Sequence, residues 1–316
     1  MILWTTELPS DAGRTRPTSS SFTTVDRIGD WVQVRLCRAP YRLHTSFTVS
    51  VIHACGNFSM VNLSVCIEMF WLDETDPAAK VRNVKESGIG AYEFWAWSNK
   101  DVDAVAEAQA ETGLACAGHL SEPPFALTAR ETEQALVEGV SKSAAIAERL
   151  GSPGMIVTTG NILADEAWDI TLRRVVRRLK VLSAVAADRG LKIYLEPLNP
   201  VVDHHGYWLT TMAQAADIVA EVDSPALTIL YDIYHQQITE GNLISNLRTY
   251  LPLIGHIHTA GVPGRHELAD NEIDYRAVFR AIDESDYAGY VGLEFRPSLS
   301  EAEALAQAVR IAEQAV

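Results

Sequence analysis

The segment KIYLEPLNP, residues 192–200, decides the fold assignment of this chain. Its first four residues form a short apolar run that is typical of a buried strand. The run ends in Glu196, and Pro197 prevents the strand from continuing. Because an isolated buried charge is energetically costly, a carboxylate in this position is expected to be paired, to bind a metal ion or to act in catalysis.

Three later segments repeat this arrangement of a polar residue near the end of an apolar run. LTILYDIYH has Asp232 in this position, LIGHIHTAG has His258 and YVGLEFRP has Glu294. From Glu196 onward the intervals between the four residues are 36, 26 and 36 positions. Each interval suits one strand, one helix and two short loops. The four polar side chains are therefore predicted at the same end of four consecutive strands.

Short apolar runs alternate with helical segments throughout residues 59–316. The strands are predicted at 60–68, 91–97, 114–120, 154–160, 192–199, 227–235, 254–261 and 290–297. The helices are predicted at 76–88, 101–113, 129–150, 165–189, 211–222, 242–251, 274–286 and 299–316. Eight such units in about 250 residues are typical of an α/β protein with the TIM (β/α)8 barrel fold. A doubly wound open sheet is the alternative, but its GxGxxG motif is absent. In a TIM barrel the active site lies at the carboxyl ends of the strands, where the four polar residues fall.

The composition excludes several classes of protein. The chain has 316 residues, of which 47% are hydrophobic, and a net charge of −15. Nucleic acid is not expected as a partner, because phosphate contacts need clustered Lys and Arg. No apolar run approaches the roughly 20 residues of a membrane span, and the N-terminus lacks the pattern of a secretory signal. The four cysteines form no CxxC pair, so we expect a reduced, cytoplasmic protein.

Residues 1–58 differ from the rest of the chain. They contain six Arg, no Lys and four acidic residues, and they show no clear periodicity apart from strand character over 42–54. The remainder has 26 − 6 = 20 basic and 41 − 4 = 37 acidic residues, a net charge of −17. We predict a disordered tail, or upstream sequence included through a wrong start codon, with Met60 as the true start. Residues 59–316 would then form a single catalytic domain.

Three carboxylates and one imidazole form a donor set suited to a divalent metal ion. Mn²⁺ or Mg²⁺ is favoured, and Co²⁺ or Zn²⁺ is also compatible. An ion that holds both oxygens of an α-hydroxycarbonyl acidifies the neighbouring C–H bond. Glu196 and Glu294 are then expected to remove and return the proton, giving isomerisation or epimerisation through an enediolate. A structural salt bridge is the alternative for each carboxylate alone, but four polar residues in register favour a metal site.

Four further residues are candidates for substrate binding. His235, in YDIYHQQ, is a candidate donor to a substrate oxygen. Arg265, in the Gly/Pro loop GVPGRHE, suits bidentate binding of a carboxylate. Glu93 and His119 stand near the ends of earlier predicted strands. A buried structural role is the alternative for His235, Glu93 and His119, and a surface position is the alternative for Arg265.

Several of these segments resemble one family. LEPLNP, YDIYHQQITEGNL, GHIHTAGVPGRHE, EIDY and GLEFRP are similar to segments of the hydroxypyruvate isomerase branch of the xylose isomerase-like TIM barrels. The likeness covers about residues 60–297. The resemblance implies that the metal ligands are Glu196, Asp232, His258 and Glu294. It also implies that Glu196 and Glu294 transfer protons and that His235 and Arg265 contact the substrate.

One position of the family pattern separates two substrate classes. The best-known hydroxypyruvate isomerases have Gln where His258 stands, whereas the related ketose 3-epimerases have His. We therefore expect an isomerase that interconverts hydroxypyruvate and 2-hydroxy-3-oxopropanoate, or one that acts on a similar small 2-oxo acid. The alternative is a ketose 3-epimerase or another keto-sugar isomerase. Arg265 favours an acidic substrate and His258 favours a sugar.

Two other functions agree less well with the sequence. A phosphodiesterase for damaged DNA is disfavoured by the net charge of −17 over residues 59–316. A non-catalytic sugar-binding barrel would not need two glutamates facing each other across a metal ion. A homo-oligomer is compatible with the sequence.

Overall fold

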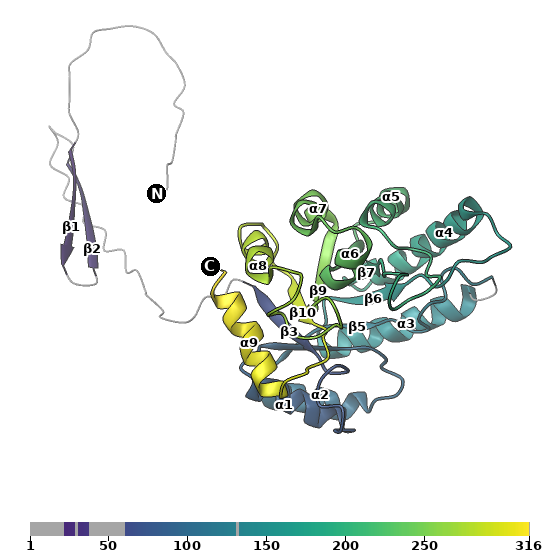
Figure 1. Ribbon diagram of the computed structural model, residues 1–316, viewed down its shortest axis with the longest axis horizontal. Helices are drawn as coiled ribbons and strands as arrows, with labels where there is room; N and C mark the ends of the chain where they lie inside the picture. Colours follow the sequence, from purple (N-terminus) through teal and green to yellow (C-terminus); the bar gives the residue numbers. More distant parts are fainter. Residues whose placement is uncertain (1–21, 29–30, 38–60, 131–132, 316) are drawn as a thin grey trace, which may run out of the picture. The chain divides into compact units, whose positions relative to one another are not determined.

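The computed structural model describes residues 22–28, 31–37, 61–130 and 133–315 (Figure 1). The chain divides into two compact units, Met1–Gly56 and Asn57–Val316.

The first unit contains a two-stranded antiparallel sheet. Its strands are β1 (Phe22–Ile28) and β2 (Trp31–Cys37), paired from Phe22 opposite Cys37 to Ile28 opposite Trp31. The strand character noted over 42–54 lies outside the described residues. The interpretation of residues 1–58 as a tail or as mis-assigned upstream sequence therefore stays a prediction.

The second unit is a closed barrel of eight parallel strands, which confirms the predicted TIM barrel (Figure 1). Around the barrel the strands follow the order β10-β3-β4-β5-β6-β7-β8-β9. The last strand of the chain, β10, pairs with the first strand of the barrel, β3, through Tyr290 and Asn62 and with β9 on its other side, which closes the barrel. The strands are β3 (Asn62–Cys66), β4 (Ala91–Phe94), β5 (Ala115–Leu120), β6 (Gly154–Thr158), β7 (Lys192–Glu196), β8 (Leu227–Asp232), β9 (Ile254–Thr259) and β10 (Tyr290–Leu293).

Helices surround the barrel, and the caps expected from the sequence begin and end several of them. Asp76 accepts a hydrogen bond from Ala78 N with Pro77 at the first helical position, and Gly113 ends α2 in the left-handed conformation. The helices are α1 (Pro77–Glu86), α2 (Val102–Thr112), α3 (Glu133–Leu150), α4 (Trp168–Ala187), α5 (Met212–Val222), α6 (Ile233–Thr239), α7 (Leu243–Tyr250), α8 (Tyr275–Asp283) and α9 (Glu301–Glu313), with a 3-10 turn at Leu251–Leu253. Within the described residues, no helix has the length and apolarity that a membrane crossing requires.

The prediction of a strand over 227–235 was wrong at its end. Strand β8 stops at Asp232, and α6 begins at the next residue. The Asp232 side chain accepts a hydrogen bond of 3.1 Å from the backbone N–H of His235, and this contact starts the helix. Ile233 and Tyr234 are buried within α6, so their apolar character does not distinguish a strand from a buried helical turn.

Side-chain alternation along the strands places the candidate ligands inside the barrel. On β7, Ile193 and Leu195 belong to the main hydrophobic core, whereas Tyr194 packs with Ile156 and Leu230 in a separate small cluster. Because alternate residues of a strand face the same side, Glu196 shares the side of Tyr194. By the same rule, the residue two positions after Leu230, Asp232, joins Glu196 on the inner side.

A glycine allows α3 to pack closely against the loop that follows β5. A Cβ at Gly139 would lie 2.0 Å from the backbone oxygen of Glu122 and 2.7 Å from Pro123 Cδ. No side chain fits there without displacement of the loop. This loop carries Phe125, which lies near the mouth of the barrel.

We predict that Gly139→Ala destabilises the protein, although alanine is the better helix former. The free energy of unfolding from urea denaturation should fall by about 1–3 kcal/mol, the usual cost of overpacking. Ala145→Gly, at an exposed position of the same helix, is the reverse change and should cost about 1 kcal/mol through helix propensity alone. A more stable Gly139→Ala variant would contradict the close packing.

Candidate active site

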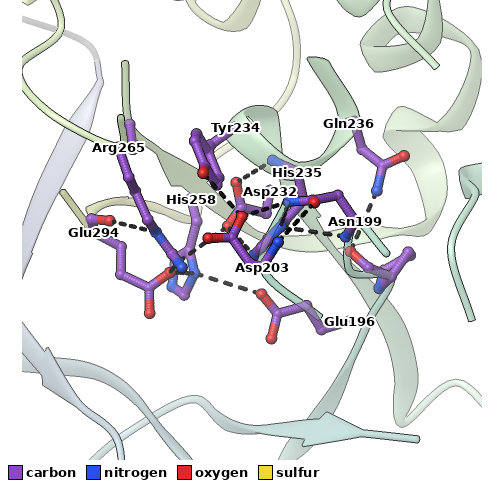
Figure 2. A network of polar contacts seen from close by, with 12 residues as sticks. Glu196, Asn199, Asp203, Asp232, Tyr234, His235, Gln236, His258, Arg265 and Glu294 are labelled. Atoms are coloured by element: carbon purple, nitrogen blue, oxygen red, sulfur yellow. Dashed lines mark hydrogen bonds and ion pairs between the residues drawn. The ribbon is translucent and has the colours of Figure 1, made fainter. Parts of the chain in front are cut away.

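The four residues predicted as ligands meet at the carboxyl end of the barrel. Glu196 and Asp232 end β7 and β8, His258 lies near the end of β9, and Glu294 directly follows β10. One potential ligand atom from each lies within 4.8 Å of the others, and all four residues are buried. In the view of Figure 2 the two glutamates lie to either side of His258. This group has the donors and spacing to hold a divalent metal ion.

The cluster contains more buried negative charge than its neighbours balance. Burial raises the pKa of Glu196 to about 8, with His258 opposing the shift and the other carboxylates adding to it. Burial also raises the pKa of Asp232. For Glu294, burial acts in the same direction, but Arg265 and His258 outweigh it and lower the pKa. A cation bound among these groups would relieve the repulsion between them.

The imidazole of His258 also has the contacts of a potential ligand. Its Nδ1 lies 3.2 Å from Glu294 Oε2 and 3.9 Å from Glu196 Oε1, and its Nε2 lies 3.0 Å from Glu93 Oε1. Neither nitrogen has hydrogen-bond geometry to a protein group, although both are buried. Buried nitrogens normally have a partner. An ion between Nδ1 and the carboxylates would provide one, so the residues fit a metal ion.

Glu93, a candidate substrate contact for which a structural role was the alternative, lies against His258 inside the barrel and is not among the residues that line the cavity. Its Oε2 is 2.8 Å from His256 Nε2 and accepts a hydrogen bond from Ser64 Oγ. Burial would raise the pKa of Glu93, but His258 and His256 lower it to about 2. A carboxylate that contacts a ligating histidine from behind fixes its ring orientation.

A glycine on β10 leaves room for this pair. A Cβ at Gly292 would lie 2.2 Å from Glu93 Oε1 and 2.7 Å from His258 Cδ2. The contact between Glu93 and His258 therefore depends on the absence of a side chain at this position.

A cavity of about 360 Å³ opens over the cluster. Its polar lining includes Glu196, His258 and Glu294, together with two of the predicted substrate contacts, His235 and Arg265. The remaining lining residues are mainly apolar, namely Trp95, Ala96, Leu120, Phe125, Ile156 and Leu198, with Thr158 and His204 between them. Trp95 also contacts the cluster, because its Nε1 donates a 2.6 Å hydrogen bond to Glu294 Oε1.

Arg265 supplies positive charge at the edge of the cluster. Its Nη2 lies 2.5 Å from Glu294 Oε2 and 3.8 Å from Asp232 Oδ2. The guanidinium carbon lies 5.1 Å from the centre of the Tyr234 ring, within the range of a cation–π contact. The backbone of Arg265 has φ of 59°, a left-handed conformation that is uncommon for a residue with a side chain.

His119 does not line the cavity either. Its ring stacks on Phe94 at 5.3 Å, and burial lowers its pKa to about 4. The surroundings of His119 are those of a packed, neutral side chain.

Several polar residues that contact the candidate site were not predicted from the sequence. His256 is one, and its signal was available in the IGHIHT strand, where it stands two residues before His258 and so faces the same side. Asn199, Asp203 and Tyr234 form a second group beside His235 (Figure 2). Asn199 and Asp203 lie on the loop after β7, where no periodicity marks their direction.

Comparisons with known proteins agree with this architecture. A family model described as a xylose isomerase-like TIM barrel matches residues 81–314. A protein of Danio rerio named "Putative hydroxypyruvate isomerase" is 31% identical over 253 residues, which are 75% of this chain and 91% of the relative. The 2-oxo-tetronate isomerase of Cupriavidus necator is 34% identical over 148 residues, which are 47% of this chain and 56% of that protein.

Solved structures with lower identity share the fold. A family 2 AP endonuclease of Brucella melitensis superposes with a TM-score of 0.75 at 22% sequence identity. The superposition covers 79% of this chain and 98% of the endonuclease chain. The 3-keto-D-glucoside 4-epimerase of Escherichia coli superposes with a TM-score of 0.69 at 24% sequence identity. The superposition covers 81% of this chain and 100% of the epimerase chain. Similarity at this level of identity shows the fold alone.

We predict that Glu93→Gln destabilises the metal-free protein, because it leaves His258, whose pKa is raised by Glu294 and Glu93, facing a neutral group inside the barrel. Breaking a buried charged pair typically lowers the free energy of unfolding by about 3–5 kcal/mol, which urea denaturation can measure. Glu111→Gln breaks an exposed pair with Arg82 and should leave stability nearly unchanged. Equal effects of the two variants would show that Glu93 has no structural role towards these histidines.

Proposed function

Because the chain belongs to the xylose isomerase-like TIM barrel family, we propose that it is a metal-dependent isomerase of a small 2-oxo acid. The reaction would interconvert hydroxypyruvate and 2-hydroxy-3-oxopropanoate, or the two forms of a similar acid. The named relatives are isomerases, and the chain is an isomerase of the same family. Its substrate and its dependence on a metal ion are the parts that we propose.

The observation that carries the proposal is the buried cluster at the floor of the cavity. Glu196, Asp232, His258 and Glu294 offer three carboxylates and one imidazole within 4.8 Å of one another. Oxygen-rich sets of this kind suit Mn²⁺ or Mg²⁺, and Co²⁺ or Zn²⁺ is compatible with the imidazole. When bound, the ion would act as a Lewis acid that polarises the substrate carbonyl and acidifies the adjacent C–H bond.

The protein itself would hold and move the proton. Glu196 and Glu294 both line the cavity, so a substrate placed over His258 would contact a carboxylate at either end. One glutamate would accept the proton from carbon, and the other would return a proton to the neighbouring carbon. The hydrogen bond from Trp95 to Glu294 Oε1 would keep this carboxylate oriented towards the cavity.

Arg265 supports an acidic substrate. Its guanidinium lines the cavity and already lies against a carboxylate of the protein, Glu294. A substrate carboxylate would present the same planar pair of oxygens to this fork. His235 lines the same cavity and would donate to a substrate oxygen.

A ketose 3-epimerase, or another keto-sugar isomerase, is the second candidate. The cavity of about 360 Å³ has room for more than a three-carbon acid. His258 would serve as a ligand equally well in such an enzyme. The most direct test incubates Mn²⁺-loaded protein with hydroxypyruvate, 2-oxo-tetronates and ketoses and resolves the products by chromatography.

Arg265→Lys should distinguish the two substrate classes. The lysine keeps the charge but loses the second parallel hydrogen bond, so KM for hydroxypyruvate should rise about tenfold or more. KM for a neutral ketose should change less, because it has no carboxylate. Arg173→Lys, an exposed change on α4, should leave both values unchanged. Equal losses on acids and neutral ketoses would favour the epimerase.

Glu294→Gln should separate metal binding from proton transfer. Glutamine still offers an oxygen ligand but takes up no proton, so calorimetry should show weakened Mn²⁺ binding while kcat falls by about 10²–10⁴. Asp232→Ala should abolish binding of the ion, because it removes a ligand altogether. A Glu294→Gln variant with more than about a tenth of wild-type kcat would exclude Glu294 as a base.

A further inference from the structure

The ring of His235 is held by two donors from one residue. The backbone N–H of Asn199 donates to His235 Nδ1 at 3.3 Å, and Asn199 Nδ2 lies 2.7 Å from the same nitrogen. Both groups of Asn199 are donors only, so Nδ1 accepts, and the neutral ring carries its proton on Nε2. His235 lines the cavity, and its Nε2 lies 3.5 Å from Asp232 Oδ2. Its Nε2–H therefore points to the carboxylate cluster and is the one N–H of this ring that a molecule bound there would share.

The side chain of Asn199 is itself fixed in one orientation. Its Oδ1 accepts hydrogen bonds from the backbone N–H groups of Val202 at 2.9 Å and Asp203 at 3.3 Å. Its Nδ2 donates to Asp203 Oδ2 at 2.7 Å. A flipped amide would place oxygen against His235 Nδ1 and nitrogen against two backbone donors. The amide therefore stays with its nitrogen towards His235, and Asn199 is fully buried.

The same oxygen of Asp203 is linked through Tyr234 to Arg265, the second predicted substrate contact. Tyr234 donates its hydroxyl hydrogen to Asp203 Oδ2 at 2.8 Å, and the Tyr234 ring lies against the guanidinium of Arg265. Figure 2 shows this network beside the carboxylate cluster. Asp203 and Asn199 do not line the cavity, whereas His235 and Arg265 do. The network thus connects His235 and Arg265 through residues that do not themselves line the cavity.

We propose that Asn199 and Asp203 are positioning residues for substrate binding. Asn199 sets His235 as an Nε2–H donor, and Asp203 connects Asn199 to Tyr234, which supports Arg265. The inference rests on the proposed function for the substrate contacts of His235 and Arg265. It goes further by assigning the tautomer of His235 and the residues that determine it. The enzyme would then offer a neutral donor and a cation to substrate oxygens in one fixed arrangement.

The tautomer can be measured without substrate. Protein labelled with ¹⁵N-histidine and saturated with Mg²⁺ should show His235 with an unprotonated Nδ1 and a protonated Nε2, the signal being assigned with His235→Gln. Asn199→Asp puts an acceptor against Nδ1 with little change of shape. This variant should protonate Nδ1 and raise KM about tenfold or more for the best substrate. Asn99→Asp, the same change at an exposed position, should alter neither.

The role of Asp203 has its own pair of variants. Asp203→Ala removes the acceptor shared by Asn199 and Tyr234, and KM should rise about tenfold. Asp203→Asn retains a carbonyl that can accept both hydrogen bonds, so KM should stay within about threefold of the wild-type value. This rescue would not occur if Asp203 acted through its charge alone.

Two results would overturn the inference. One is a wild-type His235 with its proton on Nδ1, and this measurement needs no variant that folds. The other is an Asn199→Asp variant whose His235 signal is unchanged. If the tautomer behaves as expected but no 2-oxo acid or ketose is converted, the role of Asn199 in setting the tautomer stands and the proposed function fails.

Discussion

The crowding of three buried carboxylates around one imidazole is the constraint on which the rest of the site depends. Burial disfavours the ionised forms of Glu196 and Asp232, and each carboxylate raises the cost of ionising the others. Positive charge therefore has to come from nearby groups. Arg265 provides it at one edge. At the centre, a protonated His258 provides it while no ion is bound, because Glu294 and Glu93 raise its pKa although burial alone would lower it. A metal ion ligated by the neutral ring would take over this role. The surrounding residues then have to hold Arg265 and His258 in place.

Much of the barrel could be predicted because the sequence marks where its elements begin and end. The pair Asp76–Pro77 marks the start of a helix, and Gly113 marks an end, each through a local backbone preference. The four cluster residues were found for a similar reason. A polar residue that closes an apolar run on a parallel strand has only the mouth of the barrel in which to place its side chain.

The remaining features depend on contacts that no local pattern encodes. Glu93 lies on β4, whose register with β5 shifts between Tyr92 and Glu93, and its partners His256 and His258 come from the distant strand β9. The start of α6 depends on whether Asp232 caps a helix or ends a longer strand, and the apolar residues that follow suit both. The loop carrying Asn199 and Asp203 is positioned by its partners on α6, which lie more than 30 positions away in sequence.

The residues that line the cavity come from both halves of the barrel, and the two halves supply different kinds of side chain. The four cluster residues belong to β7 through β10 or directly follow them, whereas many of the apolar walls, including Trp95, Leu120, Phe125 and Ile156, come from β4 through β6 and their loops. Substitutions at Leu120, Phe125 or Ile156 can thus reshape the space available to a bound molecule, whereas Trp95 donates a hydrogen bond to Glu294 and is tied to the cluster. Such an arrangement lets substrate range evolve separately from reaction chemistry at these three positions, which makes them the natural targets for redesigning what the enzyme accepts.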